Sequence, residues 1–95
     1  MTTEIVTLIA VPGNEEELGQ AILRGLDIIR QHPGLISARA ERCIEKPGQY
    51  LLINNWTSLE AHINDFRSGP LFPQWRSQIA GLFEGNPVVF HYEPF

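Results

Sequence analysis

The sequence predicts an α+β fold whose elements run in the order strand, helix, strand, strand, helix, strand. Apolar residues recur with strand-like or helix-like periods in successive segments, and turns rich in Gly and Pro separate those segments. This order is the split βαβ arrangement, in which a four-stranded antiparallel sheet carries its helices on one face. Because no linker or repeat divides the chain, we expect one ferredoxin-like domain over residues 1–95.

The first strand and the first helix are expected at the N-terminal end. Residues 4–11 are rich in β-branched side chains and stop at Pro12-Gly13, which predicts a strand followed by a turn. Asn14 suits a helix N-cap, and residues 15–17 are glutamates whose charge complements the helix dipole. The helix is expected to end near His32-Pro33-Gly34. Its apolar stripe comprises Leu18, Ala21, Ile22, Gly25, Ile28 and Ile29.

A β-hairpin is expected next. Residues 35–45 and 50–56 form two strand-like runs on either side of the turn at 46–48. Apolar residues of the first run alternate with polar ones and comprise Ile36, Ala38 and Ala40. Ser58 then suits the N-cap of a second helix. The expected inner face of that helix comprises Leu59, Ile63 and Phe66.

The second helix is expected in two pieces. Residues 67–70 interrupt it, and Pro73 fits only in the first turn of the piece that follows. The apolar face of this second piece comprises Phe72, Trp75, Ile79, Leu82 and Phe83. Residues 85–87 end it, and residues 88–94 are expected to form the last strand.

Both faces of the expected sheet are apolar. In the first strand, Val6 and Leu8 alternate with Ile5 and Ile9, and in the third strand Leu52 and Trp56 alternate with Leu51 and Ile53. The helices cover only one face, so the other would expose a large apolar patch. We therefore expect a homodimer whose two sheets pack face to face.

Composition excludes several classes of function. The seven basic residues are scattered among eleven acidic ones, which argues against nucleic-acid binding. No apolar run approaches the roughly 20 residues of a membrane span. A lone Cys43 and the absence of a secretion signal indicate a cytoplasmic protein. The three histidines are widely separated, so no metal site is expected, and the absence of a phosphate-binding loop argues against nucleotide binding.

His62 is the first candidate for a catalytic base. It follows Leu59 by three residues and precedes Phe66 by four, so it should point toward the sheet. A neutral imidazole there can accept a proton from a phenol near pH 7. The alternative is a structural histidine at a helix edge. His91 on the last strand faces either the pocket or the partner subunit.

The remaining candidates would hold a substrate. Trp56 and Trp75 suit stacking against a planar aromatic ring, although core packing also explains them. Asn54 and Asn55 lie together near a strand end, where an amide either holds a substrate oxygen or bends the chain. Arg76 would pair with Glu84 or Asp65, or contact an anionic substrate. The expected catalytic residues are His62 and Asn55, and the expected substrate-binding residues are Asn54, Trp56, Phe66, Phe72, Trp75 and His91.

Several motifs together resemble the antibiotic-biosynthesis monooxygenase family. They are H-P-G-L at 32–35, P-G-x-Y-L-L-I-x-x-W at 47–56, N-N-W-T-S-L-E-A-H at 54–62, F-x-S-x-P-x-F at 66–72, W-R at 75–76 and P-V-V-F-H-Y-E-P at 87–94. The resemblance implies a dimeric α+β barrel with a pocket between sheet and helices in each subunit. It also implies a cofactor-independent monooxygenase or quinol-oxidising enzyme that uses molecular oxygen on a small aromatic or polyketide-like substrate.

Two alternatives accompany this expectation. One is a non-catalytic dimer that binds a small ligand in the same pocket. The other is haem degradation, whose enzymes in this fold group place Asn on the first strand, Trp on the second helix and a haem-ligating His ten residues later. The corresponding positions here are Val6, Asp65 and Trp75, so haem degradation is not expected.

Overall fold

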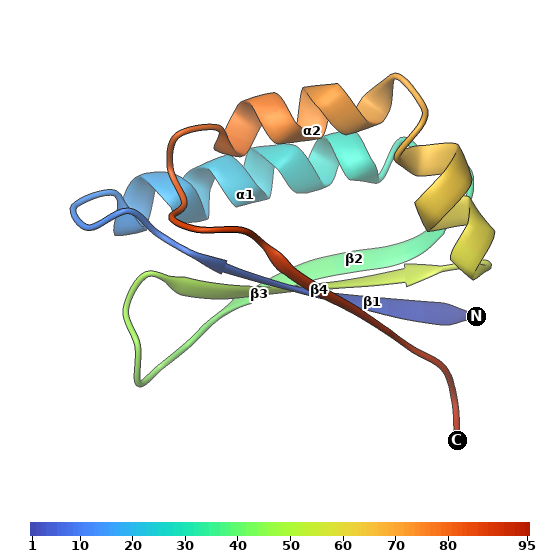
Figure 1. Cartoon of the computed structure of the whole chain (residues 1–95), viewed down its shortest axis with the longest axis horizontal. Helices are drawn as coiled ribbons and strands as arrows, with labels where there is room; N and C mark the ends of the chain where they lie inside the picture. Colours follow the sequence, from blue (N-terminus) through green and yellow to red (C-terminus); the bar gives the residue numbers. More distant parts are fainter.

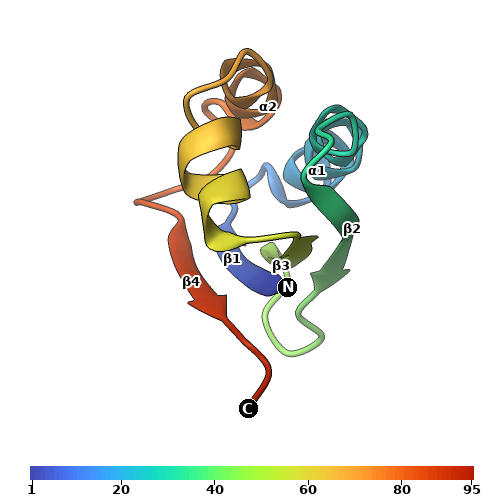
Figure 2. The same cartoon turned by 90° about the vertical axis from the view of Figure 1, so that its right-hand side faces the viewer.

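The computed structural model describes residues 1–95 and confirms the predicted fold class (Figure 1). The strands are β1 (Thr2–Ile9), β2 (Leu35–Arg42), β3 (Gln49–Trp56) and β4 (Val88–Tyr92). The helices are α1 (Glu15–Ile29), the π-helix η1 (Ala61–Phe66) and α2 (Leu71–Ile79). All strand pairs are antiparallel, in the order β2-β3-β1-β4. Both α-helices and η1 lie on the same side of this sheet (Figure 2).

The core lies between the sheet and the helices. In β1, Val6 and Leu8 point to the helices, and Leu52 of β3 lies beside Val6 in the same layer. Residues on the inward side of α1 and α2 complete it. The buried apolar residues are Val6, Leu8, Ala10, Leu18, Ala21, Ile22, Leu26, Ile29, Leu52, Trp56, Ala61, Phe66, Trp75 and Ile79. Alternation with a period of two in the strands and spacing of three and four in α1 and α2 explain most of this set, and Ala61 and Phe66 come from η1.

Two details of α1 differ from the prediction. Leu26 is buried and belongs to the apolar stripe, whereas Ile28 is only half-buried. Asn14 stands at the N-cap position, but its side-chain amide donates to Glu17 Oε2 at 3.0 Å instead of capping the helix. The main-chain N–H of Leu18 bonds the carbonyl of Asn14 at 2.9 Å, so the first turn forms without a side-chain cap.

A β-bulge in β2 overturns the expected position of Ile36. Leu35 pairs with Trp56 and Ser37 pairs with Asn55, so Ile36 is an extra residue without a partner on β3. Its side chain is 56% exposed, unlike those of Ala38 and Ala40. A bulge breaks the period of two, and simple alternation therefore fails at this point.

The segment after β3 winds more widely than an α-helix. Ser58 Oγ accepts the N–H of Ala61 at 3.1 Å, as the prediction of a cap requires, and the N–H of Arg67 bonds the carbonyl of His62, five residues earlier, at 3.1 Å. This wider turn buries Ala61, His62 and Phe66. Leu59 and Ile63, which α-helical spacing placed on the inner face, are exposed. The expected inner face was therefore wrong for these two residues: Ile63 lies within η1, where α-helical spacing does not hold, and Leu59 lies just before it.

The helix α2 is shorter than predicted. It ends at Ile79, so Leu82 and Phe83 lie beyond it, where Phe83 forms an isolated antiparallel bridge with Ala10. Both side chains still pack against the core from this loop. Pro73 lies in the first turn of α2, as expected.

The outer face of the sheet carries no helix (Figures 1 and 2). Its exposed side chains include Ile9, Val88, Phe90 and Tyr92, of which Phe90 is 60% exposed. This is the second apolar face that the alternation predicted. The homodimer that would cover it stays a prediction. None of the helices is long and apolar enough to cross a membrane.

Candidate active site

A cavity of about 350 Å³ lies between the inner face of the sheet and the helices η1 and α2. Its volume is near the lower end of the roughly 300–1,000 Å³ that small-molecule sites occupy. Aromatic side chains from η1 and α2 form much of the wall, and they are Phe66, Phe72 and Trp75. The polar side chains of the wall are Glu4, Asn54, His62, Arg67 and Arg76. The site therefore combines an apolar body with a few convergent polar groups.

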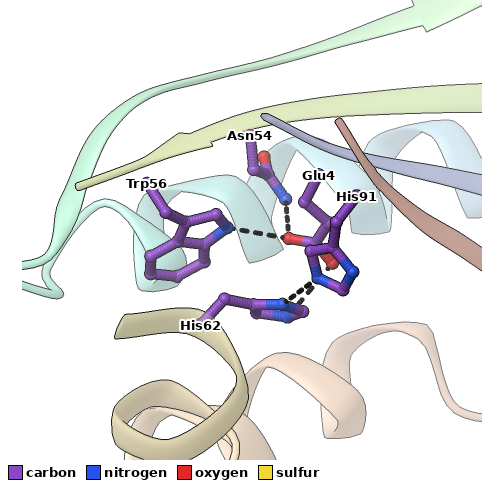
Figure 3. Close-up of polar contacts among 5 residues, drawn as sticks. All are labelled: Glu4, Asn54, Trp56, His62 and His91. Carbon is purple, nitrogen blue, oxygen red and sulfur yellow. Dashed lines mark hydrogen bonds and ion pairs between the residues drawn. The ribbon is translucent and has the colours of Figure 1, made fainter. Parts of the chain in front are cut away.

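Glu4 is the buried acid of this cavity. It belongs to the inner face of β1 with Val6, and only 5% of it is exposed. Its Oε1 accepts the Asn54 amide N–H at 3.1 Å and the Trp56 indole N–H at 2.9 Å (Figure 3). Its Oε2 lies 3.2 Å from Nε2 of His62. A buried carboxylate needs such donors, because burial without them costs several kcal/mol.

His62 links Glu4 to His91 of β4. Nδ1 of His62 lies 2.8 Å from Nε2 of His91 (Figure 3). With Glu4 as a carboxylate, the hydrogen-bond pattern assigns a hydrogen to Nε2 of His62, which donates to Glu4. Nδ1 of His62 is then an acceptor, and His91 donates to it. Both ring nitrogens of His62 are therefore engaged in this arrangement.

The electrostatic surroundings keep His62 neutral. Burial, together with the positive charge of Arg67 and the proximity of His91, lowers the pKa of His62 to about 4. The imidazole is therefore uncharged at pH 7. Its contact with Glu4 is then a hydrogen bond from a neutral ring to a carboxylate and not an ion pair.

Aromatic rings hold His62 in place. Its ring stacks on Trp56 with centroids 5.1 Å apart and planes at 28°, and it lies 6.0 Å from the ring of Phe66 at 27°. Phe66 in turn meets Phe72 edge to face at 5.6 Å. Such pairs add roughly 0.5–1.5 kcal/mol each beyond burial alone. The imidazole is thus a fixed part of the wall.

Asn54 carries an acceptor without a partner. Its Nδ2 must face Glu4 because only the NH₂ end of the amide can donate to a carboxylate, so its other end is the oxygen Oδ1. This oxygen is buried and makes no hydrogen bond, in a side chain that is 2% exposed. A buried acceptor left unsatisfied costs about 1–3 kcal/mol. The atom has almost no accessible surface, so it is closed off from the cavity that other atoms of Asn54 line.

The structure brings most of the sequence-predicted residues to one place. Asn54, His62, Phe66, Phe72 and Trp75 line the cavity. Trp56 and His91 do not line it, but each contacts His62 directly.

Asn55 lies on the opposite face of the sheet, which overturns its expected place in the site. Its Oδ1 accepts the hydroxyl of Thr3 at 2.7 Å, and its Nδ2 donates to Ser37 Oγ at 2.9 Å. The strand alternation that points Trp56 and Asn54 inward points Asn55 outward.

Glu4 and Arg67 belong to the wall but were not among the predicted site residues. For Glu4 a signal existed, since it shares the period-two set of Val6 and Leu8 and is an acid on an otherwise apolar face. No comparable pattern marks Arg67. Arg76 pairs with neither Glu84 nor Asp65. Its guanidinium lies over the rings of Phe72 and Phe83, 5.9 and 5.6 Å from their centroids.

The chain offers no obvious place for a metal ion. No group of three or more His, Cys, Asp or Glu side chains converges on one point. The two ring nitrogens of His62 already contact Glu4 Oε2 and His91 Nε2.

The fold and this cavity define a class of small α+β proteins with a ligand site between sheet and helices. The family model described as antibiotic biosynthesis monooxygenase matches residues 1–78. The chain belongs to this family.

Several proteins are similar to this chain over nearly its whole length. The uncharacterized protein YczJ of Bacillus subtilis is 28% identical over 93 residues, which is 98% of each chain. A solved structure from Bordetella bronchiseptica with the same family description is 26% identical and has a TM-score of 0.92, covering 99% of this chain and 96% of the other. SnoaB of Streptomyces nogalater is 18% identical with a TM-score of 0.78, covering 98% and 92%, and shows likeness of fold alone.

Proposed function

We propose that the protein is a cofactor-independent monooxygenase, or a closely related quinol-oxidising enzyme, that acts on a small aromatic molecule in the cavity. The observation that carries this proposal is the buried Glu4–His62 pair at the wall of an aromatic cavity, beside the unpartnered oxygen of Asn54. The family membership supports it, as does the description of SnoaB as a cofactor-independent oxygenase.

In this proposal the protein deprotonates and orients the substrate. A substrate hydroxyl displaces His91 from Nδ1 of His62 and gives its proton to that nitrogen. The Glu4 carboxylate at Nε2 stabilises the imidazolium that forms, as the acid of a catalytic triad does. The positive charge of Arg67 favours the anionic form of the substrate, and the apolar wall excludes water from around it.

The deprotonated substrate then reduces oxygen itself. In monooxygenation of an aromatic methylene group, one oxygen atom of O₂ replaces two hydrogens to form a carbonyl, and the other leaves as water. In quinol oxidation, two electrons and two protons pass to O₂, giving a quinone and hydrogen peroxide. Both reactions need a proton acceptor and a fixed orientation of the substrate, for which His62 and the aromatic wall are suited.

We also propose that residues 1–95 form a single domain and that the working form is a cytoplasmic homodimer. The apolar outer face with Ile9, Phe90 and Tyr92 supports the dimer, because a face of this kind is unfavourable in water unless a second copy covers it. The cavity lies on the other side of the sheet.

A non-catalytic ligand-binding protein is the second candidate. The specific observation in its favour is that both ring nitrogens of His62 are engaged, so a base is free only after His91 moves. A protein that binds phenols tightly without consuming oxygen would establish this alternative.

The test is oxygen uptake by chelator-treated protein with a panel of hydroquinones, anthrones and flavonol-like phenols. We expect uptake above autoxidation, and we expect His62→Ala to reduce kcat by roughly 10²–10⁴-fold, the usual contribution of a general base. Gln31→Ala, an exposed change in the turn after α1, is the matched control and should leave the rate unchanged. Uptake that does not depend on His62 would contradict the proposed mechanism.

A further inference from the structure

Two arginines of the cavity wall have no partner within the chain. The guanidinium of Arg30 pairs with Asp27, that of Arg39 with Glu41, and Arg24 donates to Gln78. The guanidinium groups of Arg67 and Arg76, by contrast, form neither a hydrogen bond nor an ion pair, although both residues line the cavity. Both side chains are also exposed, so they stand where the cavity meets solvent.

The surroundings of Arg76 fix its guanidinium beside the cavity. The group lies over the ring of Phe72, itself part of the wall, and over the ring of Phe83. A guanidinium held on aromatic faces keeps its N–H groups free in its own plane. These N–H groups match the two oxygens of a carboxylate.

The charges of the wall are unequal. Glu4 is its one acid and already accepts from Asn54, Trp56 and His62, whereas Arg67 and Arg76 are free. Two guanidiniums against one carboxylate leave the wall with a net charge of +1, in a chain whose net charge is −4. This local excess of positive charge favours an anion at the open side of the cavity.

The deep side of the cavity carries the opposite charge. The carboxylate of Glu4 lies there, in a residue that is only 5% exposed, and it would repel a carboxylate of the substrate. The substrate carboxylate is therefore expected at the open side of the cavity, beside the two arginines.

We infer that the cavity takes a compact aromatic substrate that carries a carboxylate besides the hydroxyl group of the proposed reaction, and that the carboxylate meets Arg67 and Arg76. The aromatic ring packs against Phe66, Phe72 and Trp75. A volume of about 350 Å³ favours one or two rings. This inference names a substrate class for the proposed function. The reaction of that substrate depends on the proposed function, whereas its predicted binding does not.

The experiment compares two probes that differ in one charge: 2,5-dihydroxyphenylacetate and its methyl ester. Binding is measured by isothermal titration calorimetry without oxygen, so that no turnover occurs. We expect the acid to bind about tenfold more tightly than the ester, in line with charge-assisted hydrogen bonds to guanidinium. We expect Arg67→Gln combined with Arg76→Gln to abolish the difference. Arg42→Gln is the matched control, because Arg42 is exposed, unpaired and outside this cavity.

Three results would overturn the inference. They are equal binding of acid and ester, a preference for the acid that survives the double substitution, and no binding of the acid at millimolar concentration. The result of this binding experiment is independent of the result of the oxygen-uptake test of the proposed function. Selective binding of the acid without any oxygen uptake would support this inference and contradict the enzyme, whereas rapid oxidation of neutral hydroquinones without preference for acids would do the reverse.

Discussion

Replacing Trp56 by alanine is expected to lower the free energy of unfolding by about 3–5 kcal/mol, the usual cost of deleting a large buried aromatic ring. Trp56 is fully buried, and its ring contacts His62, Phe66 and His32. Its indole N–H also donates to Glu4. The substitution therefore leaves a cavity in the core and removes one of the donors that hold a buried carboxylate.

Trp56→Phe separates these two contributions. It retains a ring in the core and removes the N–H, so we expect a smaller loss of about 1.5–3 kcal/mol, that of a hydrogen bond to a charged group. Leu23→Ala on α1, where the side chain is 53% exposed, is the control and should change stability by less than about 0.5 kcal/mol. Urea unfolding followed by far-ultraviolet circular dichroism measures all three. A loss below about 1 kcal/mol for Trp56→Ala would show that this ring does not organise the site.

The second large effect is a loss of stability in mild acid that depends on His62. The folded pKa of His62 is about 4, below the ordinary value of 6.5, so between these two values the unfolded chain binds the proton first. Stability is therefore lost as the pH falls from 6.5 to 4, and below 4 both states are protonated and the loss is complete. A pKa difference of this size changes the free energy of unfolding by about 3 kcal/mol at most.

His62→Gln isolates this effect. Glutamine retains a donor for Glu4 but does not titrate, so the variant should lack the part of the pH dependence that His62 contributes. The charged and titratable groups that face His62 are Glu4 of β1, His91 of β4 and Arg67 after η1, and all three are unchanged in the variant. The measurement is the free energy of unfolding in urea at pH 4 to 8 for both proteins. Parallel curves would mean that His62 is not held neutral by its surroundings.

Much of the fold was predictable because the regular elements follow simple periods. The two β-strands of the hairpin and the stripe of α1 are marked by apolar residues at spacings of two or of three and four, and Gly and Pro mark the turns. The failures fall where the backbone departs from those periods. The bulge at Ile36 shifts one strand by a residue, and α-helical spacing does not hold in η1, where Ile63 is exposed.

The site was predictable to a similar extent. His62 was found because it lies between apolar residues of one helix, and Asn54 because an amide is unusual in a strand. The strand alternation with Trp56 also separates Asn54 from Asn55, and it excludes the latter from the cavity. Arg67 could not be placed, because its position depends on the π-helical turn that precedes it. The contact between His62 and His91 joins segments far apart in sequence, which no local pattern reveals.

The most direct test of the central proposal is the fate of labelled oxygen. Chelator-treated protein is allowed to turn over its substrate under ¹⁸O₂, and the product is analysed by mass spectrometry. A monooxygenase that needs no cofactor should place one ¹⁸O atom in the product and the other in water, and His62→Ala should abolish the labelled product. A product without ¹⁸O, formed with hydrogen peroxide, would contradict monooxygenation and establish quinol oxidation in its place.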